Sequence, residues 1–264
     1  MMLGRALAFL RRDAADQLSY PVALALELSS VLVVCAMFYF LGQWVDRTGA
    51  RLGSSYFAFA LTGIALASFL SLGLAAFSAQ VRQAQLAGTL EALFTAPVYS
   101  AEIVLWGSLW RFSYEALKVS LYLGCGALLG VGFQRANWGA ALLVLLLSVL
   151  ALAPLGVLGA AFVLVYKRGD PIALLLGTLS TLFAGVYYPL DVLPSWLEPL
   201  SRLLPLTHAV AAFRGALLEG HGLSELARPL SILLAFSVVL GPIALAAFAF
   251  AVARAKARGT LSSY

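Results

Sequence analysis

Long apolar runs constrain the fold of this chain more than any other feature of its sequence. Six runs can be marked, at about 22–44, 56–78, 103–133, 139–166, 170–188 and 230–253. A helix of about 20 apolar residues crosses the hydrocarbon core of a bilayer, and helical backbone satisfies its own hydrogen bonds there. We therefore predict an all-α polytopic membrane protein with six transmembrane helices. They form a single transmembrane domain, residues 1–264, with spans 1–2 in 22–78, spans 3–5 in 103–188 and span 6 in 230–253.

Composition and charge agree with this prediction. Hydrophobic residues make up 62% of the chain and charged residues only 11%, against roughly 25% charged residues in soluble domains. Lys and Arg are more frequent in the flanks that include both chain ends than in the opposite flanks, which places both termini in the cytoplasm. These flanks explain the net charge of +5, so we expect no nucleic-acid partner. We expect a multi-pass protein of the cytoplasmic (inner) membrane.

Two segments do not fit spanning helices. Residues 1–20 show an amphipathic pattern that is typical of an interfacial helix. Residues 189–228 are interrupted by Pro194, Pro199 and Pro205, and they are too polar to cross a bilayer yet too apolar for a free loop. Because backbone at membrane depth must be hydrogen-bonded or buried in protein, we interpret 189–228 as outer re-entrant helices before the last span.

The motifs of an energy-converting enzyme are missing from the sequence. None of the lysines lies in a G-x-x-x-x-G-K-[ST] pattern, so the chain has no P-loop of its own. It contains neither a metal-binding His pair nor a G-x-S-x-G motif. Cys35 and Cys125 have no metal-ligand spacing, and we interpret them as small buried hydrophobes. We therefore expect no enzyme, with no catalytic residue, no metal and no cofactor in this chain.

A charged cluster is predicted inside the third span. Arg111, Glu115 and Lys118 follow one another at spacings that place them on neighbouring positions of a helix. Glu27 lies in the first span, near the cytoplasmic side. Three interpretations stay open: a self-neutralising group at the inner interface, a gating or dimer-contact cluster, and the proton relay of an ion- or proton-coupled secondary transporter.

A short polar helix is predicted between spans 2 and 3. Residues 83–97 favour helix, with Leu90 and Leu93 on an apolar stripe, and Pro97 ends the element. A helix that rests on lipid usually carries Lys and Arg on its polar face, whereas this one carries Glu91. The pattern therefore indicates a cytoplasmic helix that docks on another protein.

The same residues resemble a known family. The stretch GTLEALFTAP, 88–97, resembles the G-T-x-E-x-L-x-x-x-P loop that type-2 ABC exporter permeases carry between their second and third spans. The stretches YPLDVLPSWL, 188–197, and LPLTHAVAAFR, 204–214, are similar to the family's outer segment, and RRD, 11–13, is similar to part of its N-terminal helix. With the six spans, the resemblance covers essentially the whole chain.

The resemblance implies the membrane-spanning permease subunit of an ATP-driven ABC exporter. It implies a homodimer of permease subunits and two copies of a separate ATPase subunit that binds ATP and Mg. It also implies alternating access, which moves an amphipathic small molecule, drug or lipid-like substrate outward. A glycan is a further substrate class. It assigns Glu91 as the polar contact and Phe94 as the apolar plug of a coupling helix. The residues implied in coupling are Gly88, Thr89, Leu90, Glu91, Leu93, Phe94, Pro97, Arg11, Arg12 and Asp13. A path along the seam between subunits would include Ser71, Thr178, Thr181 and Phe183.

Overall fold

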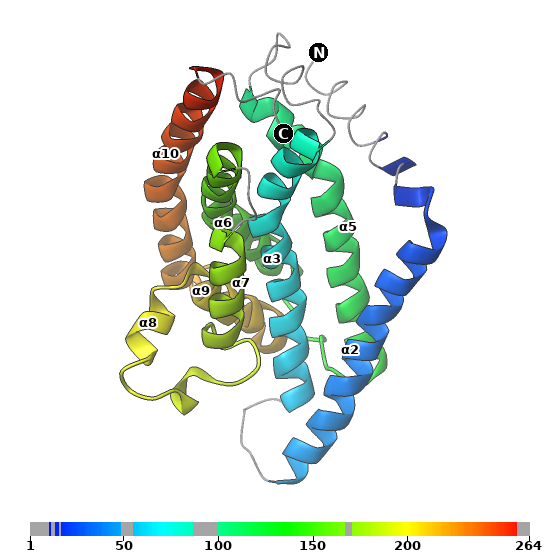
Figure 1. The fold of residues 1–264 in the computed structure, drawn as a ribbon. Helices are drawn as coiled ribbons and strands as arrows, with labels where there is room; N and C mark the ends of the chain where they lie inside the picture. Colours follow the sequence, from blue (N-terminus) through cyan, green and yellow to red (C-terminus); the bar gives the residue numbers. More distant parts are fainter. Residues whose placement is uncertain are drawn as a thin grey trace.

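The computed structural model shows a bundle of long helices (Figure 1). It describes residues 11, 14–15, 17–48, 55–86, 100–166 and 171–257. Every regular element in these ranges is helical, which confirms the predicted all-α class. The elements are α2 (Pro21–Arg47), α3 (Tyr56–Leu86), α5 (Ser100–Leu128), α6 (Trp138–Tyr166), α7 (Pro171–Phe183), η1 (Leu190–Val192), α8 (Glu198–Arg202), α9 (Pro205–Arg214), η2 (Gly215–Glu219) and α10 (Ala227–Ala257).

Four of the described helices, α2, α3, α6 and α10, are long and apolar enough to cross a bilayer. They correspond to the predicted spans 1, 2, 4 and 6, although α3 continues to Leu86, well beyond the predicted end at 78. Helix α5 has 29 residues and is also long enough, but charged side chains lie along its middle. It ends at Leu128 rather than 133, before Gly130, whose φ of 95° is left-handed and incompatible with a continuing helix.

Helix α7 differs most from its predicted span. The sequence predicts 170–188, whereas the helix covers the 13 residues Pro171–Phe183. At 1.5 Å per residue it is about 20 Å long, shorter than the roughly 30 Å hydrocarbon core. The chain leaves the helix at Gly185, whose φ of 74° is left-handed, and the flanking Ala184 and Val186 are buried in protein. The count of six spans therefore stays a prediction.

The core of the bundle is centred on α3. In its most apolar window, 82% of the residues are buried, against 17% for α2 and for α10. Helix α3 contacts α2, α5, α6, α7 and α9, and Figure 1 shows it between α2 and α10. The two peripheral helices expose large apolar side chains such as Phe40 and Phe250, which suits faces that meet lipid or another protein.

Helices α3 and α6 approach each other closely at a glycine. A Cβ atom on Gly156 of α6 would lie 2.7 Å from the carbonyl oxygen of Gly73 in α3. Small residues allow the backbones of membrane helices to come this near. On α6, Ala160 and Leu164 also belong to a buried cluster that Phe248 joins from α10. The order α3–α6–α10 thus forms one packed layer.

The segment 189–228 contains the short helices η1, α8, α9 and η2. Helix α9 is the most buried of them, with Leu206, Val210 and Phe213 inside the protein. It packs against α3, α6, α7 and α10, so it is part of the core rather than a surface loop. The predicted re-entrant position of this segment in a bilayer stays a prediction.

The predicted coupling helix, 83–97, lies mostly outside the described residues. Residues 83–86 are the last turn of α3, because that helix ends at Leu86, and Gly88–Pro97 lie outside the described residues. Of the N-terminal candidates, Arg11 is helical and exposed, whereas Arg12 and Asp13 also lie outside the described residues. Helix α2 begins and helix α10 ends at the same end of the bundle (Figure 1).

Candidate functional site

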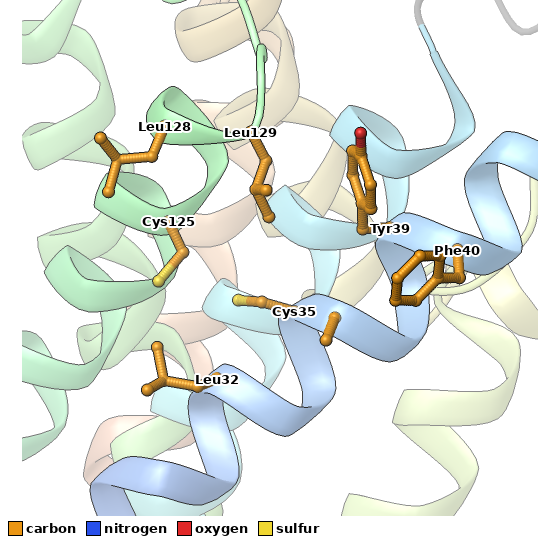
Figure 2. Close-up of a pocket in the computed structure, with 8 residues that line it drawn as sticks. Leu32, Cys35, Tyr39, Phe40, Cys125, Leu128 and Leu129 are labelled. Carbon is orange, nitrogen blue, oxygen red and sulfur yellow. The ribbon is translucent and has the colours of Figure 1, made fainter.

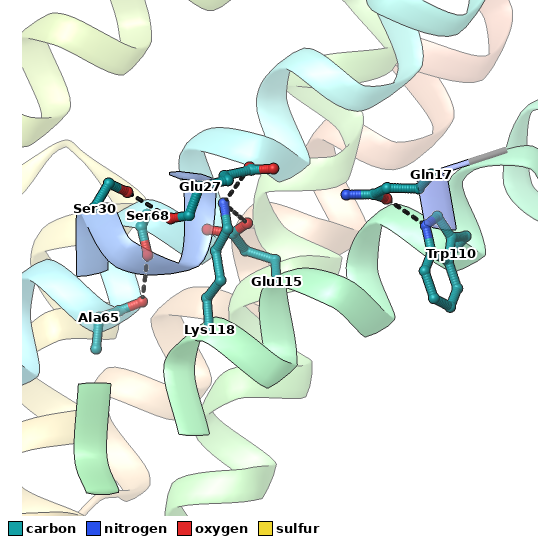
Figure 3. A network of polar contacts seen from close by, with 8 residues as sticks. All are labelled: Gln17, Glu27, Ser30, Ala65, Ser68, Trp110, Glu115 and Lys118. Atoms are coloured by element: carbon teal, nitrogen blue, oxygen red, sulfur yellow. Dashed lines mark hydrogen bonds and ion pairs between the residues drawn. The ribbon is translucent and has the colours of Figure 1, made fainter. Parts of the chain in front are cut away.

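A partly buried ion-pair cluster joins α2 to α5. The ammonium Nζ of Lys118 lies 2.7 Å from Glu27 Oε1 and 3.0 Å from Glu115 Oε2. Figure 3 shows Lys118 between the two carboxylates, one from each helix. The Glu115 and Lys118 side chains are 5% and 15% exposed, whereas Glu27 is 46% exposed. We call Glu27, Glu115 and Lys118 the Lys118 cluster.

The Lys118 cluster contains one carboxylate more than it contains ammonium groups. Away from water, the attraction between such groups is several times stronger than at a protein surface. The Tyr114 ring adds a further contact, with its centroid 5.2 Å from Lys118 Nζ. The cluster can therefore hold α2 against α5 in a part of the bundle where α2 has few other buried side chains.

The three residues of the predicted charged group, Arg111, Glu115 and Lys118, do not all contact one another. The spacing of Glu115 and Lys118 does produce an ion pair, as expected for residues three apart on a helix. Arg111, one turn earlier, instead donates from Nη2 to Gln83 Oε1 of α3, at 2.9 Å. Near the same end of α5, Trp110 Nε1 donates to Gln17 Oε1 in the N-terminal segment (Figure 3). Helix α5 thus contacts α2, α3 and the N-terminal segment through polar side chains.

A second polar site is formed by Arg214, the last residue of α9. Its guanidinium donates from Nε and Nη2 to the carbonyl of Phe59 in α3, at 3.1 and 2.9 Å. It also donates from Nη1 to the carbonyl of Gly185 at 2.7 Å and from Nη2 to that of Val186 at 2.8 Å. The guanidinium carbon lies 3.5 Å from the centroid of the Phe59 ring. We call these contacts the Arg214 clamp.

The Arg214 clamp explains the break after α7. The carbonyls of Gly185 and Val186 no longer have a helical partner, and buried carbonyls without a partner are costly. Arg214 supplies the missing donors because its guanidinium presents several N–H groups in a fixed fork. Gly63 leaves the space: a Cβ there would lie 2.6 Å from the Val186 carbonyl oxygen and would also clash with Arg214.

The residues predicted to line a path lie on two helices that contact each other. Thr178, Thr181 and Phe183 are on α7, and Ser71 is on α3. Thr181 bonds back to its own helix, donating to the Gly177 carbonyl at 2.7 Å, and Thr178 is exposed. A cavity of about 390 Å³ lies nearby between α3, α6 and α7, but its lining includes Ser78 and Arg82 and none of the four predicted residues. The path stays a prediction.

Sequence reasoning missed two of these functional contacts. The sequence places Glu27 near the cytoplasmic side but does not pair it with Lys118, because no spacing rule connects different helices. Arg214 was noted only as the end of a motif, and its partner Phe59 is far away in the chain. One signal was available for Arg214: an arginine that ends an apolar helix with no acidic residue in the first turn. In the described part of the chain, no group of three His, Cys, Asp or Glu side chains is arranged to hold a metal ion.

Comparison with known proteins shows the class to which this membrane-type bundle belongs. The family model described as "ABC-2 family transporter protein" matches residues 43–246, so the chain belongs to the ABC-2 transporter family. It is 25% identical over 185 residues to the inner membrane transport permease YadH of Escherichia coli K12, with 70% of this chain and 72% of the relative covered. YadH proteins of Escherichia coli O157:H7 and Shigella flexneri match equally well. The predicted resemblance is confirmed: the chain is an ABC-2 permease, a transport subunit and not itself an enzyme.

Proposed function

We propose that this chain is the permease subunit of an ATP-driven exporter that moves an amphipathic small molecule, drug or lipid-like substrate outward by alternating access. The observation that carries the proposal is the family match over residues 43–246. The apolar lengths of α2, α3, α6 and α10 support it. In this proposal α5 and α7 with its extension complete six spans, with both termini in the cytoplasm. The substrate class rests on the absence of a long aromatic run from the spans, which sugar-binding paths often contain.

The energy source of the proposed exporter is a separate chain. The sequence has no P-loop, so two copies of an ABC ATPase subunit would bind ATP and Mg. A second copy of the permease would complete a homodimer. The exposed apolar faces of α2 and α10 support this arrangement, because large apolar surfaces mark protein or lipid contacts.

Coupling is proposed for residues 88–97, which connect the end of α3 to the start of α5. A force on that connection would reach the most buried helix of the bundle, α3, and the helix that carries Lys118. From α5 it would pass to α2 through the Lys118 cluster. Glu91 is the proposed polar contact with the ATPase and Phe94 the apolar one, and Arg11 is a further candidate for this contact.

The experiment is co-purification of the tagged chain with its ATPase from its native cells, followed by ATP hydrolysis in liposomes. The double variant Glu91→Arg, Phe94→Ala should lose the bound ATPase and its coupled activity. The matched control is Asp191→Arg, Val192→Ala, which reverses a charge and removes an apolar side chain at exposed positions of the outer segment. Equal ATPase recovery and activity for both double variants would contradict the proposed coupling role.

Membership of the ABC-2 family does not favour the alternative of an ion- or proton-coupled secondary transporter. The same liposomes test it directly. Uptake of a fluorescent cationic dye should require ATP, and a pH gradient alone should drive none. Dye movement under a pH gradient without ATP, lost in Lys118→Met, would overturn the proposal in favour of the carrier.

A further inference from the structure

The two cysteines of the chain come together between α2 and α5. Cys35 lies on α2 and Cys125 on α5, ninety residues apart in sequence, and both line one cavity. Figure 2 shows their sulfur atoms directed into the space between the two helices. Cys35 is 2% exposed, and both are free thiols. Cys35 is buried, as its interpretation as a small buried hydrophobe expects, and Cys125 is half-buried; the two thiols also share this cavity.

The cavity beside the thiols is apolar and partly aromatic. It measures about 340 Å³ and is lined by Leu32, Ala36, Tyr39, Phe40, Leu128 and Leu129 in addition to the cysteines. Its volume lies in the range of small-molecule pockets, roughly 300–1,000 Å³. Leu128 and Phe40 are 89% and 70% exposed, so the cavity opens at the outer face of the peripheral helix α2. A molecule that enters there from the bilayer must be soluble in the membrane.

We propose that Cys35 and Cys125 form a redox-active dithiol whose oxidant is a membrane-soluble quinone that binds in this cavity. A quinone fits the observations because it is a planar ring that can stack on Tyr39 or Phe40. It is apolar enough for a lining that offers few polar groups. It also accepts two electrons, the number that a pair of thiols releases.

The reaction balances within the dithiol and the quinone. One thiol sulfur loses its proton and adds to a ring carbon of the quinone, which forms an S–C bond. The second sulfur loses its proton and attacks the first, so that one S–S bond forms, the S–C bond breaks and its electron pair passes to the ring. The two electrons and two protons from the thiols convert the quinone to a quinol. The quinol leaves by the open side of the cavity, and a thiol reductant reverses the bond.

A disulfide here would tie two helices together at a defined place. Cys35 follows Glu27 by eight residues on α2, and Cys125 follows Lys118 by seven on α5. The thiol pair therefore lies about 10 to 12 Å along the helices from the Lys118 cluster. Because α2 is otherwise held by few buried side chains, the bond would restrict movement of α2 against α5.

The test uses the full chain in lipid nanodiscs, with decylubiquinone as the oxidant and no ATPase. After the reaction the protein is denatured and labelled with a maleimide, and the adducts are counted by intact mass. The reduced protein should carry two adducts, because the chain has two cysteines, and the quinone-treated protein should carry none until dithiothreitol is added. Two adducts after quinone treatment would overturn the proposal.

Three variants separate a dithiol from independent oxidation. Cys35→Ser and Cys125→Ser should each keep their single adduct after quinone treatment, and loss of that adduct would show that the thiols do not act as a pair.

Ala36→Phe, which fills the cavity, should slow oxidation by decylubiquinone but not by diamide, a small oxidant. Equal slowing or no slowing with both oxidants would refute the cavity as the quinone site. The result does not depend on the proposed exporter function.

Discussion

The Arg214 clamp gives a prediction whose size can be worked out from the structure. Arg214→Leu keeps much of the side-chain volume but removes the donors to three carbonyls, those of Phe59, Gly185 and Val186. The Phe59 carbonyl keeps a donor, the hydroxyl of Thr62, so the loss falls on the carbonyls of Gly185 and Val186. A buried acceptor without a partner costs about 1–3 kcal/mol, so these two together cost roughly 2–6 kcal/mol. Removal of a shielded cation recovers part of its desolvation cost. We expect a net loss of about 2–4 kcal/mol in the free energy of unfolding, below the full cost of two unpaired buried carbonyls because of that recovery.

The assay is unfolding of the purified chain in a mild detergent, followed by a thiol-reactive dye and by limited proteolysis after Phe183. Arg214→Lys should retain part of the stability, because a single ammonium cannot reach carbonyls on two separate elements. The matched control is Arg202→Leu, whose side chain is 65% exposed and pairs with Glu198. An exposed pair of this kind contributes about 0–1 kcal/mol. Equal stability of Arg214→Leu and Arg202→Leu would refute the reasoning.

A second variant tests the same clamp from its other side. Gly63→Ala places a Cβ against the Val186 carbonyl oxygen and the guanidinium, so it should displace Arg214. If Gly63→Ala lowers the free energy of unfolding because it displaces Arg214, the double variant Gly63→Ala, Arg214→Leu should lose less stability than the two single losses added together. Full additivity would show that Gly63 acts independently of Arg214.

Two further predictions concern the packing of the bundle. In the Lys118 cluster, Lys118→Met should lower the free energy of unfolding by about 3–5 kcal/mol, because it leaves two facing carboxylates without a cation. Glu27→Gln should lower it by about 1 kcal/mol or less, since Glu27 is half exposed. Thermal unfolding in the same detergent ranks the two, and the reverse order would contradict the account. At the α3–α6 crossing, Gly156→Ala should destabilise the chain, whereas Gly124→Ala, where a Cβ would meet nothing within 4 Å, should be neutral or gain up to about 1 kcal/mol of helix propensity. The same loss in both glycine variants would show that the close approach to Gly73 is not the cause.

The sequence predicts the helices well and their mutual contacts poorly. Apolar runs identify α2, α3, α6 and α10 because a single helix meets the requirement of the bilayer by its own composition. They overestimate the fifth span, since Tyr187 and Tyr188 look apolar while the backbone at Gly185 has already left the helix. The donors that make this break tolerable come from Arg214, and no local pattern connects it with residues 185 and 186.

The candidate sites show the same contrast: the sequence predicts contacts within one helix but not contacts between two helices. The helical repeat of 3.6 residues predicts that Glu115 and Lys118 are neighbours, and the structure contains this ion pair. The partner on α2, Glu27, and the meeting of Cys35 with Cys125 depend on how two helices are placed beside each other. Family resemblance supplied what local periodicity could not, because the loop motif at 88–97 points to a partner protein rather than to a contact within the chain.

The Lys118 cluster and the cysteine pair, both between α2 and α5, bear on how far α2 can rotate about its own axis. An ion pair alone fixes how far α2 is displaced along α5, but it allows α2 to turn about its own axis through the flexible Lys118 side chain. The proposed disulfide two turns away, between Cys35 and Cys125, would fix that angle as well. One residue inserted in α2 between Glu27 and Cys35 would turn the second contact by about 100° and leave the first in place. Such an insertion would separate the axial position of α2 from its orientation, which no side-chain substitution in this interface can do.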